Sequence, residues 1–165
     1  MNDDPLELQT GDQPRASVIV LHGLGASGDD FVPVCEQLDL VACGPLRYVL
    51  PHAPQRPVTI NGGFVMPAWY DILALGSHGG EDEAGLRSSQ ALVDALIARE
   101  VSRGVAPERT ALAGFSQGCA MTLMPGLRHP RPLRIPAQDP RRCLIPAARK
   151  CAGFSTRPGA NTATS

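Results

Sequence analysis

The chain has 165 residues, of which 43% are hydrophobic and 19% are charged, and its formal net charge is −1. This length and composition fit one globular domain, and the near-neutral charge gives no overall attraction to nucleic acid. The acidic N-terminus lacks an apolar signal region and the longest aliphatic runs are too short to cross a bilayer, so we expect no nucleic-acid partner, no stable membrane insertion and no export. Five cysteines without a CxxC pair favour a reducing, cytoplasmic compartment and no zinc site.

Charge is unevenly distributed along the chain. Residues 1–127 carry seven arginines and fifteen acids, whereas residues 128–165 carry eight basic residues and one acid, Asp139. This shift predicts a boundary between a partial α/β domain over residues 17–127 and an irregular, basic tail rich in proline and arginine over residues 128–165. Residues 1–16 are polar and are expected to form an exposed lead-in.

The first elements of the domain follow from apolar patterns. Residues 17–21 form a short apolar run rich in β-branched residues, which predicts a strand buried on both faces. Three glycines in residues 22–28 predict a loop whose backbone approaches another group closely; a ligand oxygen and a plain strand-to-helix turn both fit. Apolar spacing then predicts a helix over residues 29–40, with Pro33 near its start, and a second strand over residues 47–50.

The middle of the chain is rich in proline and aromatic residues. The stretch over residues 51–57 holds too much proline for a helix or a central strand. Residues 58–72 contain Phe64, Trp69 and Tyr70. An aromatic loop of this kind fits an apolar substrate cleft, but we favour the simpler interpretation that these side chains cap the core.

The longest predicted helix spans residues 82–103. Its apolar stripe consists of Leu86, Val93, Leu96, Ile97 and Val101. Gly104 is a suitable C-terminal cap. The acids at residues 81–83 fit a helix N-terminus better than a metal site, because adjacent carboxylates on a helix point in different directions.

The most informative stretch is Gly-Phe-Ser-Gln-Gly at residues 114–118. It follows an apolar run over residues 110–113 and precedes a helix-compatible run over residues 119–124. This order predicts a strand, a tight turn with Ser116 at its apex, and a helix, which is the geometry of a nucleophile elbow. Pro125 is expected to interrupt the helix after about two turns of ~3.6 residues.

Five short blocks carry a resemblance when they are taken together. In order, they are HGLG at 22–25, PHAP with RPVT at 51–59, PAWYD at 67–71, EDE at 81–83 and GFSQG at 114–118. These blocks closely resemble the carboxylesterase, lysophospholipase and acyl-protein thioesterase family of small α/β-hydrolases, over roughly residues 16–133. The resemblance implies an α/β protein with the three-layer α/β-hydrolase fold and a mainly parallel sheet.

The resemblance also implies an activity and a site. The implied reaction is hydrolysis of carboxylic esters or thioesters, including short- to medium-chain acyl esters and lysophospholipids, without a metal or an organic cofactor. The implied site has Ser116 as the nucleophile, backbone N–H groups of Leu24 and Gln117 as the oxyanion hole, and an acyl groove lined by Phe64, Met66 and Trp69.

The sequence departs from the family pattern after the elbow. In this fold the triad acid and the histidine base both follow the serine, in that order. Here His129 is the one histidine and Asp139 the one acid that follow Ser116, in reversed order, so neither is a good candidate. We expect a chain that is truncated or frame-altered after about residues 124–133, with the C-terminal strands missing.

Two functional hypotheses therefore stay open. The first is a serine hydrolase whose activity is impaired because the triad Asp and His were not found. The second is a non-catalytic remnant that binds acyl groups or a partner. In either case the elbow strand is expected to become a sheet edge, which favours homodimer formation or aggregation.

Overall fold

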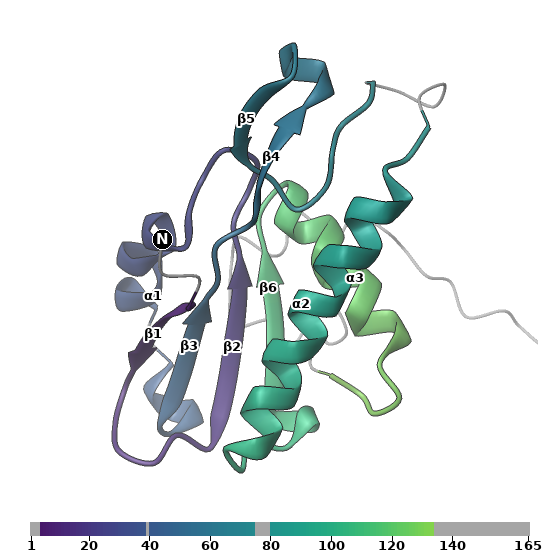
Figure 1. Cartoon of the computed structure of the whole chain (residues 1–165). Coiled ribbons are helices and arrows are strands. Elements are labelled where there is room, and N and C mark those ends of the chain that lie inside the picture. Colours follow the sequence, from purple (N-terminus) through teal and green to yellow (C-terminus); the bar gives the residue numbers. More distant parts are fainter. Residues whose placement is uncertain (1–3, 39, 75–79, 134–165) are drawn as a thin grey trace, which may run out of the picture.

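A four-stranded sheet organises the chain (Figure 1). The structure is a computed structural model, and it describes residues 4–38, 40–74 and 80–133. In spatial order the strands are β1 (Leu6–Gln9), β3 (Leu46–Leu50), β2 (Ala16–Leu21) and β6 (Thr110–Gly114). Strands β3, β2 and β6 are parallel and β1 is antiparallel to β3, so the predicted mainly parallel sheet is confirmed.

Helices cover both faces of this sheet and form the outer layers. The α-helices are α1 (Val32–Gln37), α2 (Glu83–Ser102) and α3 (Gln117–Arg128). The 3₁₀ turns are η1 (Gly28–Phe31), η2 (Val41–Cys43), η3 (Thr59–Asn61) and η4 (Pro107–Arg109). Figure 1 shows α2 and α3 side by side against the sheet.

The side-chain alternation of the strands divides the core into two clusters. Ile19 and Leu21 of β2 pack with Val93, Ile97 and Met121 from α2 and α3. The intervening positions of β2 face the other way, and there they pack with Cys35 of α1 and with Tyr48 of β3. A strand buried on both faces is typical of a parallel sheet between two helical layers.

Several sequence predictions are confirmed. Helix α2 occupies the predicted range, and Asp82 caps its start, with Oδ1 accepting a hydrogen bond of 2.9 Å from the N–H of Gly85. Gly104 follows the helix with φ +89°, a backbone conformation that favours glycine. Val101 departs from the predicted apolar stripe, since 37% of it is exposed.

Other predictions were wrong in detail. The lead-in over residues 1–16 contains β1, which pairs with β3 from Leu6↔Leu50 to Gln9↔Arg47. The helix predicted over residues 29–40 is instead the 3₁₀ turn η1 followed by the short helix α1. The first of these errors arose because β1 is short and only partly buried, so its apolar pattern is weak.

Pro125 does not stop the helix that follows Ser116. Helix α3 continues to Arg128, and the N–H of His129 donates a hydrogen bond of 2.8 Å to the carbonyl of Pro125. Proline removes one backbone donor from a helix. Here Pro125 is itself buried, as are Met121 and Thr122 before it, so packing holds the last turn in place.

A two-stranded hairpin extends past the top of the sheet (Figure 1). It consists of β4 (Gln55–Val58) and β5 (Phe64–Pro67), with η3 at its turn. The prolines of residues 51–57 predicted neither a helix nor a central strand here. This two-stranded sheet tolerates proline, because the outer edge of each strand pairs with no other described strand and therefore needs no backbone N–H donor.

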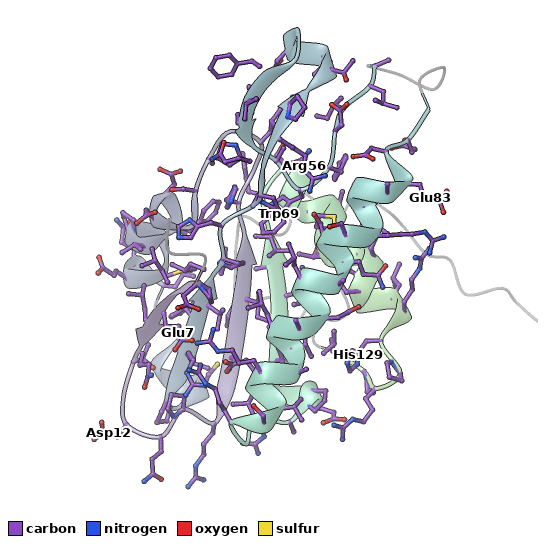
Figure 2. All side chains as sticks on the ribbon, viewed as in Figure 1. Glu7, Asp12, Arg56, Trp69, Glu83 and His129 are labelled. Carbon is purple, nitrogen blue, oxygen red and sulfur yellow. The ribbon has the colours of Figure 1, made fainter. Side chains whose placement is uncertain are left out.

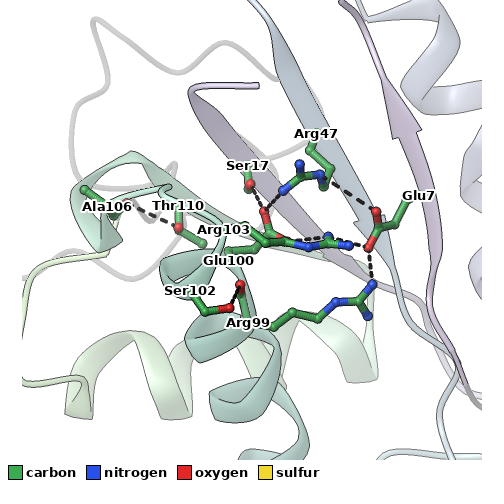
Figure 3. Close-up of polar contacts among 9 residues, drawn as sticks. All are labelled: Glu7, Ser17, Arg47, Arg99, Glu100, Ser102, Arg103, Ala106 and Thr110. Carbon is green, nitrogen blue, oxygen red and sulfur yellow. Dashed lines mark hydrogen bonds and ion pairs between the residues drawn. The ribbon is translucent and has the colours of Figure 1, made fainter. Parts of the chain in front are cut away.

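A cluster of charged side chains around the buried Glu100 holds the opposite, amino-terminal edge of the sheet (Figure 3). Glu100 of α2 is 1% exposed and accepts hydrogen bonds from the Ser17 hydroxyl and, at 2.8 Å, from Nη1 of Arg47. Glu7 of β1 accepts hydrogen bonds of 2.6 Å from Arg99 and 2.7 Å from Arg103. The cluster therefore ties β1, β2 and β3 to the end of α2.

The structure describes only the first few residues of the predicted tail. Residues 134–165, which make up most of it, lie outside the described residues. None of the helices in the described ranges combines the length and the apolar character that a membrane crossing requires.

Candidate active site

Three loops follow the carboxyl ends of the parallel strands and meet at one edge of the sheet. They are residues 22–28 after β2, residues 51–54 after β3, and the elbow at residues 114–118 after β6. Ligands of open parallel sheets bind at this edge, because the loops there are free to vary while the strands fix their positions. The elbow and the glycine loop are the two that carry the predicted chemistry.

The elbow has the strained geometry of a nucleophile turn. Ser116 has φ 53° and ψ −117°, is exposed, and stands directly before the first residue of α3. The flanking glycines are sterically required. A Cβ on Gly118 would lie 2.5 Å from the carbonyl oxygen of His22, and one on Gly114 would lie 2.7 Å from the nitrogen of Cys119.

The glycine loop lies directly against the elbow. A Cβ on Gly23 would lie 3.4 Å from Cβ of Ser116, and the N–H of Phe115 donates a hydrogen bond of 3.0 Å to the carbonyl of Leu21. Within the described ranges, the backbone N–H groups of Leu24 and Gln117 donate to no other residue. Both predicted oxyanion donors are therefore on loops that touch beside the Ser116 side chain.

His22 is fully buried and both of its ring nitrogens are engaged. Nδ1 lies 2.7 Å from the carbonyl oxygen of Gly23, and Nε2 lies 2.9 Å from the backbone nitrogen of Ala53. The carbonyl can only accept and the N–H can only donate, so these partners assign the proton to Nδ1. Burial lowers the pKa of His22 below its ordinary value, which keeps the ring neutral.

Trp69 lies in the core and does not line a groove. It is 1% exposed, and its indole Nε1 donates a hydrogen bond of 2.8 Å to the carbonyl of His22. Figure 2 shows Trp69 near the carboxyl ends of the strands, far along the sheet from Glu7. The expectation that Trp69 contacts the acyl chain is therefore corrected: its ring supports the glycine loop from beneath.

Gln117 has a buried side chain that the sequence analysis did not single out. Its Oε1 accepts a hydrogen bond of 2.8 Å from the N–H of Trp69, and its Nε2 donates one of 2.7 Å to the carbonyl of Tyr70. Gln117 is 4% exposed. The side chain thus fixes the segment around Trp69 to the first turn of α3.

Phe64 and Met66 lie on the hairpin above the site. They are two residues apart on β5, so their side chains point to the same side of the strand. Phe64 is 68% exposed, whereas Met66 is partly buried, with its sulfur 3.7 Å from the place that a Cβ on Gly25 would occupy. The side of the hairpin that carries both residues therefore borders the glycine loop.

Asp71 and Asp82 attach the hairpin to the rest of the domain. Asp71 accepts hydrogen bonds from Thr59, 2.5 Å from its hydroxyl and 2.7 Å from its N–H, and these bonds lower the pKa of Asp71. Asp82 accepts a hydrogen bond of 2.8 Å from the N–H of Asp71 and lies 3.7 Å from Nη1 of Arg56. Asp71 of the PAWYD block and Asp82 of the EDE block are thus structural anchors.

No described histidine hydrogen-bonds to Ser116. His22 is engaged on both nitrogens, and Nδ1 of His52 accepts from the N–H of Gly28 at 3.3 Å. His129 follows the last residue of α3, the helix that Ser116 precedes, so about 18 Å of helix at ~1.5 Å per residue separates them. His78 lies outside the described residues.

The family model and the curated relatives that match this chain point to the same family. The phospholipase/carboxylesterase family model matches residues 6–136. Acyl-protein thioesterase 1 homolog 1 of Dictyostelium discoideum is 43% identical over 109 residues, covering 66% of this chain and 48% of that protein. Acyl-protein thioesterase 1 of Gibberella zeae is 40% identical over 134 residues, covering 74% and 55%.

Solved structures share the fold. The crystal structure of Arabidopsis thaliana SOBER1 matches with a TM-score of 0.68 and 34% identity, covering 72% of this chain and 58% of that one. This chain spans about half the length of the curated relatives that it matches. Together with the elbow and the glycine loop, these matches show that the chain belongs to the phospholipase/carboxylesterase family of α/β-hydrolases.

Proposed function

We propose that the site is that of a serine hydrolase of carboxylic esters or thioesters that works through an acyl-enzyme on Ser116. The observation that carries this proposal is the contact between the two loops: the strained elbow holds Ser116 exposed, and Gly23 of the glycine loop lies against it. The acyl-protein thioesterase names of the relatives support the choice of esters and thioesters.

The reaction follows from what each group can do. The Ser116 hydroxyl oxygen attacks the acyl carbonyl carbon, and its proton passes through water to the leaving alcohol or thiol. The negative charge that develops on the carbonyl oxygen is stabilised by the N–H groups of Leu24 and Gln117. Collapse of this intermediate expels the alcohol or thiol and leaves an acyl ester on Ser116. Water then attacks the ester, which releases the acid and restores the hydroxyl.

We propose that Phe64 and Met66 contact the acyl chain. Both lie on the side of β5 that borders the glycine loop. Covering the exposed phenyl ring of Phe64 with an alkyl chain removes apolar surface from water, which is favourable. Trp69 is left out of this contact surface because it is buried.

The proposed activity of this chain is impaired. A serine hydroxyl is a poor nucleophile until a base removes its proton, and none of the histidines at positions 22, 52 and 129 is hydrogen-bonded to Ser116. An oxyanion hole and substrate binding alone retain roughly 10³–10⁴-fold catalysis over water when a triad is deleted. We expect turnover of that order.

The lack of a hydrogen bond from any of these three histidines to Ser116 also favours a second candidate, a non-catalytic domain that binds acyl groups. It would hold an acyl ester at the glycine loop without cleaving it. A serine-directed fluorophosphonate probe separates the two candidates, because covalent labelling requires attack by the serine oxygen, which is slow without a base, whereas binding alone leaves the serine unmodified.

The experiment labels the 165-residue chain with the probe and compares it with Ser116→Ala. Ser88→Ala, on the exposed face of α2, is the matched control. Labelling that Ser116→Ala abolishes and Ser88→Ala retains is the expected result. A chain whose circular dichroism shows it to be folded, yet which takes up no probe, would contradict the hydrolase proposal and leave the binding role.

We also propose that the edge of β6 pairs with a second copy of the chain. Among the described strands β6 pairs with β2 alone, so its other edge has N–H and C=O groups without a strand partner. Sedimentation velocity at several concentrations tests this, and a monomer at all of them contradicts it.

We also propose a cytoplasmic location, which is supported by five cysteines without a CxxC pair.

A further inference from the structure

We infer that the Gln117 side chain is a positioning residue, which sets the separation of the two oxyanion donors through a chain of hydrogen bonds from Gln117 to Trp69, His22 and Gly23. This inference rests on the proposed function of Ser116. It adds a second role to Gln117, whose backbone N–H is one of the two donors, and it gives the buried Trp69 and His22 a part in the site.

The first link joins the elbow to the segment at residues 69–70. The Gln117 amide accepts from the N–H of Trp69 at 2.8 Å and donates to the carbonyl of Tyr70 at 2.7 Å. An uncharged amide is the side chain that satisfies both partners at once, since a carboxylate only accepts and an alkyl group does neither. The link is shielded from water, because Gln117 and Trp69 are both buried.

The second link joins Trp69 to the glycine loop. The indole Nε1 donates to the carbonyl of His22 at 2.8 Å, and the two rings lie with their centroids 5.2 Å apart. The Ser89 hydroxyl donates to the carbonyl of Trp69 from α2. Trp69 therefore has little freedom to move independently of the helices on one side or of His22 on the other.

The third link sets the direction of the Leu24 N–H. The Nδ1–H of His22 donates to the carbonyl of Gly23, 2.7 Å away, and that carbonyl belongs to the same peptide unit as the N–H of Leu24. A trans peptide is planar, so fixing its C=O aims its N–H in the opposite direction. The other ring nitrogen, Nε2, accepts a hydrogen bond of 2.9 Å from the N–H of Ala53, which fixes the position of the ring.

The Gln117 N–H is aimed in the same way from the other side. Its peptide unit carries the carbonyl of Ser116, which accepts hydrogen bonds from Cys119 at 2.9 Å and from Ala120 at 3.4 Å. Both oxyanion donors thus belong to peptide units whose carbonyls are held, and the Gln117 side chain connects these two units through Trp69 and His22.

The expected size of the effect follows from how oxyanion holes work. Donors must lie ~2.7–3.1 Å from the developing charge, and removing one donor costs roughly 10²–10³ in rate. A broken link displaces a donor without removing it. We therefore expect the labelling rate of Ser116 to fall roughly tenfold to hundredfold, because a misplacement of about 1 Å costs up to ~10².

The experiment uses Gln117→Met, which keeps the length of the side chain but makes no hydrogen bond to Trp69 or Tyr70. Gln37→Met, at the exposed end of α1, is the matched control. Two readouts are compared: the rate of fluorophosphonate labelling, and the ¹H–¹⁵N chemical shifts of the Leu24 and Gln117 amides.

The Leu24 amide decides the result, because it is on the other loop and shares no peptide unit with Gln117. We expect its shift to change in Gln117→Met and to stay constant in Gln37→Met, with the melting temperature showing that both variants are folded. An unchanged Leu24 amide in folded Gln117→Met would overturn the inference, even if labelling fell. If the unmodified chain takes up no probe, the proposed function fails and the amide shifts still test the hydrogen-bonded chain.

Trp69→Phe serves as the second variant if Gln117→Met does not fold. It removes the indole donor to His22 while leaving the backbone N–H that Gln117 binds. The Leu24 amide is expected to shift in this variant too. Where both single variants fold, the double variant should slow labelling by less than the product of the two single effects, since both break one chain of bonds; independent effects would contradict the inference.

Discussion

Nη1 of Arg47 lies 2.8 Å from Oε2 of Glu100 inside the protein, at the edge of the sheet opposite the elbow. Removing one partner of a buried ion pair leaves the other charge uncompensated, which costs about 3–5 kcal/mol. We predict a loss of this order in the free energy of unfolding of Glu100→Ala, measured by urea denaturation. Glu83→Ala, which removes an exposed pair with Arg87, should cost at most about 0.5 kcal/mol. Equal losses in the two variants would contradict the prediction.

The Glu100 carboxylate also makes the free energy of unfolding depend on pH. Burial on its own would raise the pKa of Glu100, but hydrogen bonds from Ser17 and Arg47 outweigh it and the pKa lies below its ordinary value of 4.5. The unfolded chain then binds a proton before the folded one does, so this stabilisation is complete above pH 4.5 and is lost as the pH falls through the folded pKa. We predict a smaller loss of unfolding free energy below pH 4.5 in Glu100→Gln than in the unmodified chain, compared by denaturation at a series of pH values.

Gly118 is predicted to accept no side chain. A Cβ there would lie 2.5 Å from the carbonyl oxygen of His22 and would overlap the carbonyl of Leu21, and neither backbone atom is able to rotate away. We expect Gly118→Ala to lose more than ~4 kcal/mol or to fail to fold. Gly11→Ala is the control, because its Cβ would meet atoms of Pro45 at an ordinary 3.6 Å. A Gly118→Ala variant that melts within a few degrees of the unmodified chain would show that the elbow is less tightly packed than described.

His22 is predicted to carry its single proton on Nδ1 and to titrate below the ordinary histidine pKa of 6.5. Burial lowers its pKa below 6.5, and a second proton on Nε2 would meet the N–H of Ala53. Nitrogen-15 NMR of the imidazole rings should show one ring that has the Nδ1–H pattern at pH 7 and titrates below pH 6.5. Titration of every ring at or above pH 6.5 would disprove this arrangement.

Much of the fold could be predicted because its signals are local. The apolar run of β2, the glycines around Ser116 and the cap at Asp82 each dictate a conformation within a few residues. The hairpin of β4 and β5 could not be predicted in this way. Its strands contain proline, and it is held by Asp71, which bonds to Thr59 twelve residues earlier.

The candidate site likewise has parts that follow from local sequence and parts that do not. Ser116 and the glycine loop were found from their motifs, whereas the roles of Trp69 and the Gln117 side chain depend on contacts between distant segments. The hydrogen bond from Gln117 to Trp69 joins residues 48 positions apart. In the sequence, the aromatic loop at residues 58–72 fits both a substrate cleft and a cap on the core, with the cap favoured. Burial decides between them for Trp69.

The backbone of Ser116 also limits which chemical groups are able to stand at the apex of the turn. Its positive φ crowds Cβ against the preceding carbonyl, and a second heavy atom on Cβ would worsen that crowding. Cysteine differs from serine by one atom beyond Cβ and keeps a single branch, whereas threonine adds a methyl group at the crowded carbon. The backbone at this position therefore tolerates the primary thiol of cysteine better than the secondary alcohol of threonine.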